Sequence, residues 1–190
     1  MGYVMEQNEA GTVNDSELIR RYGAQQLQQI HRIKQKAKLC STKITTAESI
    51  TSGGVFHRLS LISGGSDSLV SGGTIAYSDR SKAINLNVSI TALDQFTAVS
   101  PQVAKRMALR SLQNSEGATL AVATTGYAGQ PRGKKPESMR WPWGRIATPG
   151  ELYVAIAFQP DANEHPNVFC QQYQLTGYDR TKDIDKAIEL

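Results

Sequence analysis

The sequence has few cysteines and few histidines. Its two cysteines, Cys40 and Cys170, lie far apart in the 190 residues, so they predict neither a disulfide framework nor a metal-binding pair. We expect each to be a small buried hydrophobic residue in a reducing compartment. The histidines His31, His57 and His165 show no ligand spacing, so we predict no metal site.

Long apolar runs are also missing. The longest are short, such as residues 152–158, whereas a membrane-spanning helix needs roughly 18 apolar residues. Residues 1–10 lack the basic and apolar segments of a secretory signal peptide. Hydrophobic residues make up 39% of the chain, which is enough for a core. We therefore expect one cytoplasmic domain over residues 15–190 with no membrane partner, preceded by a disordered tail over residues 1–14.

The net charge of +4 comes from two basic segments. Residues 16–40 hold six basic residues and one acidic residue, and residues 132–145 hold five and one. Such segments weakly favour an anionic partner, but a solvated helix face and a solvated loop have the same composition. A nucleic-acid binder would rest on this charge alone, so we do not expect a nucleic-acid partner.

Helix-like and strand-like segments alternate along the chain. Helices are expected at 17–39, at 55–61, at 78–86, from Ser100-Pro101 onward and at 178–190, and strands at 43–46, 71–77, 118–124, 152–158 and 168–175. This order predicts an α/β fold: a single layered domain with a mixed, mostly parallel central sheet flanked by helices. The last two strands are expected to form an antiparallel hairpin.

Residues 130–149 form an inserted basic loop in this prediction. The loop is longer than the usual connection and contains Trp141 and Trp143. We expect the two tryptophans to pack over the mouth of a pocket or against a second subunit. The alternative is a loop without a role.

Two short motifs could carry chemistry. In the segment from Glu48 to Gly54, a strand ends at small residues and a helix follows, so the Ser49 hydroxyl would lie near a helix N-terminus that can stabilise an oxyanion or a phosphate. Alternatively, Ser49 and Thr51 only cap the helix. In the second motif, an N-cap at Ser78 places Lys82 one turn into a helix, where the helix dipole favours a neutral amine that could act as a base. The alternative is an ordinary surface lysine.

Two glycine-containing motifs could contribute to binding. Thr125, Gly126 and Gly129 directly follow a predicted strand and could bring backbone N–H groups close to a ligand. Arg180 at the start of the last helix could bind a carboxylate or a phosphate. A salt-bridged surface arginine is the alternative for Arg180.

Taken in order, these motifs resemble one family, the CinA C-terminal domain or nicotinamide-nucleotide amidase family. The matching segments are Asp15-Ser16-Glu17-Leu18, Thr45-Thr46-Ala47-Glu48-Ser49, Ala76-Tyr77-Ser78 with Lys82, Ala98-Val99-Ser100, Thr125-Gly126-Tyr127-Ala128-Gly129, Gly150 with Tyr153-Val154-Ala155, and Gly177-Tyr178-Asp179-Arg180. The chain differs from the family pattern by Ile50 in place of a cysteine and Ser52 in place of a glycine. It also differs by the expanded loop.

The resemblance implies hydrolysis of the carboxamide of nicotinamide mononucleotide to nicotinate mononucleotide and ammonia, without a metal or another cofactor. It implies that Ser49 is the nucleophile, Lys82 the base and Tyr77 a residue beside the lysine. The implied substrate-binding residues are Thr51, Ser52, Gly53, Thr125, Gly126, Gly129 and Arg180. A homo-oligomer, with a dimer favoured, is implied as well.

The resemblance leads to a geometric prediction. Ser49 Oγ and Lys82 Nζ should lie within hydrogen-bond reach or one water apart, with Tyr77 touching the lysine, because a nucleophile is activated by a base at that range. The alternative function is that of a non-catalytic relative which keeps the fold as a ligand-binding or protein-interaction module.

Overall fold

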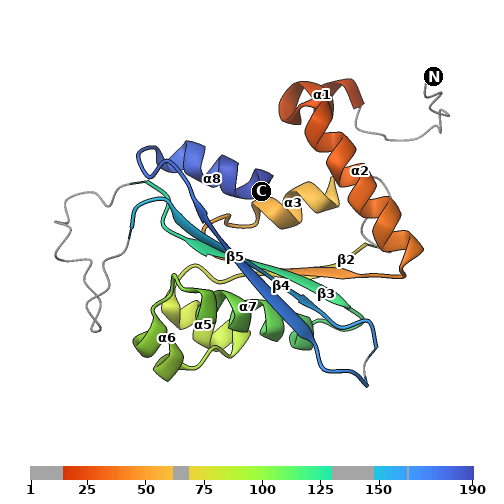
Figure 1. The fold of residues 1–190 in the computed structure, drawn as a ribbon. Helices are drawn as coiled ribbons and strands as arrows, with labels where there is room; N and C mark the ends of the chain where they lie inside the picture. Colours follow the sequence, from red (N-terminus) through yellow and green to blue (C-terminus); the bar gives the residue numbers. More distant parts are fainter. Residues whose placement is uncertain (1–14, 62–68, 130–147, 162) are drawn as a thin grey trace.

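The computed structural model describes residues 15–61, 69–129, 148–161 and 163–190. A five-stranded sheet lies between two layers of helices (Figure 1). The strands are β1 (Ile44–Glu48), β2 (Val70–Ile75), β3 (Leu120–Gly126), β4 (Glu151–Phe158) and β5 (Asn167–Gln174). The helices are α1 (Asp15–Tyr22), α2 (Ala24–Leu39), α3 (Gly54–Ser60), α5 (Asp79–Leu86), α6 (Ile90–Phe96), α7 (Pro101–Asn114) and α8 (Arg180–Glu189). The expected tail and most of the expected basic loop lie outside the described residues.

The sheet is mixed, with the strand order β2-β1-β3-β4-β5. β1 pairs in parallel with β2 and with β3, while β4 is antiparallel to both β3 and β5. Four of the five strands therefore run in one direction, and the last two form a hairpin. The predicted α/β fold with a mixed, mostly parallel sheet is confirmed.

Small side chains line the sheet face that packs against α7. They are Ala47, Ala121, Ala123, Ala155 and Ala157, all without exposed surface. Their size lets the helix approach closely, and α7 fills the space with Val103 and Met107, which are also fully buried. β1 is the central parallel strand, and all five of its residues are buried. The rigid core thus fixes the end of β1, where the serine motif begins.

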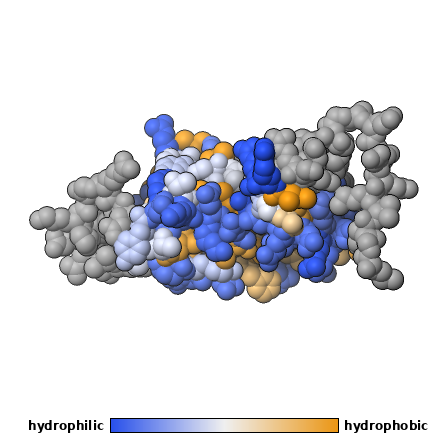
Figure 2. All heavy atoms as spheres, turned by 90° about the horizontal axis from the view of Figure 1, so that it is seen from above, coloured by the Kyte–Doolittle hydropathy of each residue, from blue (hydrophilic) through white to orange (hydrophobic). Residues whose placement is uncertain are grey.

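The other face of the sheet carries α1, α2, α3 and α8 (Figure 1). A cavity of about 560 Å³ lies between α2, α8 and the sheet, with Ile33, Val122 and Ile156 among its apolar lining residues. Seen from this side, the surface is mostly polar with scattered hydrophobic side chains (Figure 2). None of the described helices is long and apolar enough to cross a membrane.

Two local expectations were wrong, and one helix was missed. The expected single helix over 17–39 is interrupted at Gly23, whose φ of 81° is accessible to glycine but does not continue a helix. Helix α6 was not predicted, because it buries only Ala92 and Leu93 and has no clear apolar stripe. The two cysteines were both expected to be buried, but Cys40 is exposed at the C-terminus of α2 and Cys170 is half-buried.

Candidate active site

A sharp turn after β1 carries the Ser49 hydroxyl. The Ser49 N–H donates to the Thr124 carbonyl at 3.0 Å, so β3 holds the backbone of the turn. Ser52 and Gly53 follow with φ values of 51° and 94°, and these left-handed conformations reverse the chain into α3. The left-handed φ of Ser52 is one that glycine adopts without strain, which accounts for the glycine of the family pattern at this position.

Glu48 occupies the N-terminus of α3. Its buried carboxylate accepts hydrogen bonds from the N–H groups of Gly53, Val55 and Phe56 at 2.8–3.1 Å and from the Thr51 hydroxyl at 2.6 Å. The expectation that this helix end is free for an oxyanion or a phosphate is therefore wrong. The alternative of capping by Ser49 or Thr51 is wrong as well, because a carboxylate just before the turn takes that role.

Two threonines of the predicted binding set are engaged within the protein. The Thr51 hydroxyl, which donates to Glu48, also lies 2.7 Å from Thr124 Oγ1, and the Thr125 hydroxyl donates to the Ala98 carbonyl at 2.7 Å. Both threonines are buried. In this structure their hydroxyls form hydrogen bonds within the protein. Contact of either threonine with a substrate stays a prediction.

Lys82 reaches the serine from α5. Ser78 caps that helix, accepting from the Ser81 N–H at 3.1 Å while Ser81 Oγ accepts from the Ser78 N–H at 2.9 Å. The predicted cap is confirmed, and it places Lys82 one turn into the helix. Lys82 Nζ lies 3.2 Å from Ser49 Oγ and 3.2 Å from the Tyr77 carbonyl oxygen. The predicted hydrogen-bond distance between Ser49 and Lys82 is confirmed.

Burial makes this lysine chemically unusual. Its side chain is only 1% exposed, and desolvation lowers the pKa of Lys82 from its ordinary value of 10.5, while the negative charge of Asp79 partly opposes that shift. A lowered pKa increases the fraction of neutral amine, whose lone pair can accept the Ser49 proton. The alternative of an ordinary surface lysine is wrong.

Tyr77 connects the lysine to Arg180. Its main-chain carbonyl contacts Lys82, as predicted, but its phenol hydroxyl accepts a hydrogen bond from Arg180 Nη2 at 2.8 Å. Arg180 Nη1 also donates to the Ala128 carbonyl at 3.3 Å. Arg180 is exposed and forms no salt bridge among the described residues, so no acidic side chain there neutralises its charge.

The glycine loop after β3 meets the start of α8. A Cβ at Gly129, whose φ is 67°, would lie 3.0 Å from the backbone nitrogen and the Cβ of Arg180. A Cβ at Gly126 would lie 2.6 Å from the Glu151 carbonyl oxygen and 2.9 Å from Ile50. These contacts explain why the two positions need glycine: they allow close packing of protein on protein. Approach of a ligand to this loop stays a prediction.

Sequence reasoning missed the roles of Glu48 and Asp183. Glu48 is one residue before the nucleophile candidate and is only 1% exposed, as is Asp183 in the first turn of α8. Glu48 could have been identified from its place between a buried strand and a helix start, where carboxylates bind free N–H groups. The sequence carries no comparable signal for Asp183, because its partners come from separate segments.

No group of three or more His, Cys, Asp or Glu residues suited to a metal occurs in the described part of the chain.

Comparison with known proteins identifies a family for the chain. The family model for the CinA C-terminal domain matches residues 26–189. A CinA-like protein of Chlorobium phaeovibrioides is 44% identical over 104 residues, which cover 55% of this chain and 23% of the relative. A CinA-like protein of Gloeothece citriformis is 36% identical over 136 residues, which cover 72% and 30%. The chain thus matches less than a third of the length of these relatives.

A solved structure supports the same assignment. The competence/damage-inducible protein CihA of Agrobacterium tumefaciens superposes with a TM-score of 0.72 at 28% identity, covering 86% of this chain and 89% of that one. The family match extends over the sheet, the Ser49 turn and α8. The chain therefore belongs to the CinA C-terminal domain family.

Proposed function

We propose that the chain is a serine amidase that hydrolyses the carboxamide of nicotinamide mononucleotide, releasing nicotinate mononucleotide and ammonia. The observation that carries the proposal is the 3.2 Å contact between Ser49 Oγ and the buried Lys82 Nζ. A hydroxyl nucleophile needs a base within hydrogen-bond reach, and a lysine serves as that base only when its pKa is lowered. The substrate itself is taken from the family resemblance.

The reaction has two halves. Ser49 Oγ attacks the amide carbon while neutral Lys82 takes the hydroxyl proton. Collapse of the tetrahedral intermediate breaks the C–N bond, and Lys82 returns the proton to the leaving nitrogen, so ammonia departs and an ester on Ser49 remains. Water then attacks the ester, with Lys82 again accepting and returning a proton, and nicotinate mononucleotide leaves.

Two further groups have defined tasks in this proposal. Because Glu48 takes the N–H groups of α3, the oxyanion is stabilised by N–H groups of the turn itself. Those of Ile50 and Thr51 have no acceptor among the described residues. Arg180 binds the phosphate of the nucleotide through its planar guanidinium.

A panel of amides tests the proposed function. We expect ammonia release from nicotinamide mononucleotide to exceed release from nicotinamide, glutamine and asparagine. Release from none of them, combined with calorimetric binding of the nucleotide, would contradict the amidase and favour the non-catalytic ligand-binding alternative. The proposed dimer is checked separately by light scattering on the purified chain.

The pH dependence of hydrolysis follows from Lys82. The base is the neutral amine, so kcat/KM should fall as the pH drops through the pKa of Lys82, and the midpoint of this limb should lie below 10.5. Asp79 raises that pKa, so Asp79→Asn should move the midpoint to a lower pH. Asp94→Asn, at an exposed position on α6, is the control and should leave it unchanged. If Asp79→Asn left the midpoint of the pH dependence unchanged, this would argue against Lys82 as the base.

A further inference from the structure

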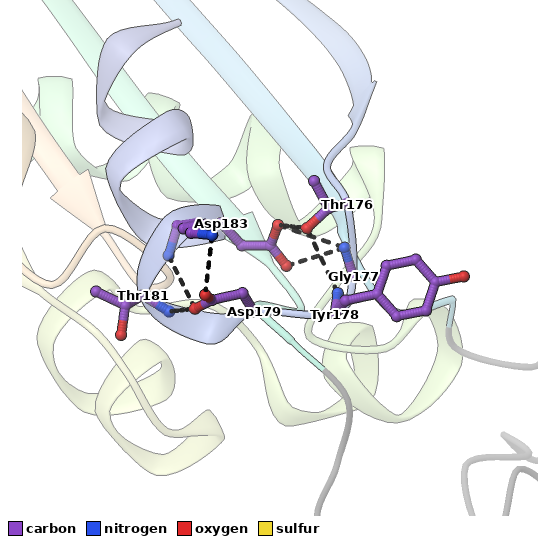
Figure 3. A network of polar contacts seen from close by, with 7 residues as sticks. Thr176, Gly177, Tyr178, Asp179, Thr181 and Asp183 are labelled. Atoms are coloured by element: carbon purple, nitrogen blue, oxygen red, sulfur yellow. Dashed lines mark hydrogen bonds and ion pairs between the residues drawn. The ribbon is translucent and has the colours of Figure 1, made fainter.

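Asp183 gathers three segments of the chain at one carboxylate. Its Oδ2 accepts hydrogen bonds from the N–H groups of Gly129 at 2.9 Å and Gly177 at 3.0 Å, and its Oδ1 accepts from the Thr176 hydroxyl at 2.6 Å. Figure 3 shows the carboxylate directed from α8 toward the Thr176–Gly177 turn. The side chain is 1% exposed. Gly129 belongs to the loop after β3, so Asp183 joins that loop, the β5–α8 turn and α8.

The joint lies directly against Arg180. Asp183 is three residues after Arg180, and the Gly129 backbone that it binds is so close to Arg180 that a Cβ there would lie 3.0 Å from the Arg180 backbone nitrogen. Arg180 in turn donates to the Ala128 carbonyl, one residue before Gly129. The guanidinium therefore rests on a loop whose position depends on the Asp183 carboxylate.

The reaction proposed above has no chemical task for Asp183. A buried carboxylate is costly unless it is fully hydrogen-bonded. Here its hydrogen bonds attach the loop after β3 and the β5–α8 turn to α8. Asp179 already caps α8 by accepting from the N–H groups of Thr181 and Lys182 (Figure 3). A second carboxylate in the first turn of α8 is thus not needed as a helix cap.

We propose that Asp183 is a positioning residue which sets the specificity for a phosphorylated substrate by fixing Arg180 against the Ala128–Gly129 loop. This inference rests on the proposed function, because it assigns the substrate phosphate to Arg180. Its action is through hydrogen-bond geometry: the carboxylate accepts from the N–H groups of Gly129 and Gly177, which are buried and would be left unpaired without it. Loss of Asp183 should therefore impair recognition of the phosphate and spare the Ser49–Lys82 chemistry.

The test compares nicotinamide mononucleotide with nicotinamide riboside, which lacks the phosphate. Asp183→Ala should raise the KM for the mononucleotide about 10-fold to 100-fold, the range for a lost charge-assisted hydrogen bond. The KM for the riboside and both kcat values should stay within about threefold of the wild type. Asp183→Asn should restore most of the loss, because its carbonyl oxygen still accepts from Gly129 and Gly177 while its amide can donate to the Thr176 hydroxyl.

A second comparison shows whether Asp183 acts through Arg180. In an Arg180→Met background, adding Asp183→Ala should change the KM for the mononucleotide by less than about threefold, because effects that share one route do not add. Ala187→Gly is the matched control: it weakens the same helix from its buried face and should not discriminate between the two substrates. The inference would be overturned if Asp183→Ala raised the KM of both substrates equally. It would also be overturned if Asp183→Ala raised the KM for the mononucleotide as much in the Arg180→Met background as in the wild type.

Binding measurements separate this inference from the proposed function. Calorimetry with the same two ligands and variants needs no turnover, and the same pattern of affinities is expected. A wild-type chain that binds the mononucleotide with this pattern but releases no ammonia would overturn the amidase and leave the role of Asp183 intact. A wild-type chain that hydrolyses the mononucleotide while Asp183→Ala keeps its affinity would overturn the inference alone. A wild-type chain that bound neither ligand would also overturn the inference about Asp183.

Discussion

Replacing Lys82 by methionine is expected to lower kcat by about 10²-fold to 10⁴-fold, the usual contribution of a general base. The same substitution should raise the free energy of unfolding at neutral pH by about 1 to 4 kcal/mol, because methionine fills a similar volume without placing an amine in a buried site. Among the described residues, Lys82 Nζ contacts Ser49 Oγ and the Tyr77 carbonyl oxygen and forms no ion pair with a carboxylate. The substitution is thus expected to lower kcat and to raise the free energy of unfolding.

The stability gain should depend on pH in a defined direction. The pKa of Lys82 is below 10.5 in the folded chain, so between that lowered value and 10.5 the unfolded chain binds more protons. The wild type therefore gains stability as the pH rises through this window, and the advantage of Lys82→Met shrinks there. Below the lowered pKa the advantage is complete. Urea unfolding at several pH values measures it.

Lys186→Met is the control for this experiment. Lys186 lies on the surface and pairs with Glu189, so its loss should change the free energy of unfolding by less than about 0.5 kcal/mol and leave kcat unchanged. If Lys82→Met kept full activity, the base would have to be another group. If it destabilised the chain at every pH, Lys82 would contribute more as a packed and bonded side chain than its burial costs.

Glu48→Gln is expected to damage both the fold and the reaction. The carboxylate accepts four hydrogen bonds, and an amide in its place sets an N–H₂ group against at least one of the N–H donors of α3. Such an unmatched buried group should lower the free energy of unfolding by about 1 to 3 kcal/mol. Because Ser49 follows directly, a shifted turn should also lower kcat by about 10-fold to 100-fold.

Thr46→Val provides the matched control on the same strand. Thr46 is buried on β1, and its hydroxyl has no hydrogen-bond partner in the described part of the structure. Its replacement by valine should therefore leave kcat unchanged and the free energy of unfolding equal or higher. Equal behaviour of Glu48→Gln and Thr46→Val would show that the carboxylate does not hold the turn. Chemical denaturation and ammonia release measure both variants.

The Ser49–Lys82 pair illustrates what a sequence can indicate about a site. The cap at Ser78 and the strand before Ser49 are local patterns, and the family resemblance led to the prediction that Ser49 and Lys82 lie within hydrogen-bond reach. Local patterns also predicted the sheet and its hairpin, because buried strands and Ser-Pro helix starts have strong signatures. The break at Gly23 and helix α6 were missed, since both depend on weak local preferences that packing overrides.

The partners of buried polar groups were less accessible to sequence reasoning. The family resemblance implied that Thr51 and Thr125 bind the substrate, but the hydroxyl of each is hydrogen-bonded inside the protein. The Asp183 carboxylate binds groups at Gly129 and Thr176, and the Gly129 contact is 54 positions away in the chain. Such hydrogen bonds are determined by the three-dimensional packing of separate segments. The helix and strand periodicity of one sequence does not reveal that packing.

Ammonia release from nicotinamide mononucleotide by the wild type, beside Ser49→Ala and Ser60→Ala, tests the central claim most directly. Ser60 lies on α3 with its hydroxyl bonded to the His57 carbonyl, so its loss should not affect the reaction. We expect the wild type and Ser60→Ala to release ammonia at the same rate, and Ser49→Ala to be slower by about 10⁴-fold or more, as for other hydroxyl nucleophiles. A wild type that releases no ammonia, or a Ser49→Ala variant that keeps the wild-type rate, would contradict the assignment of Ser49 and Lys82 as an amide-hydrolysing pair.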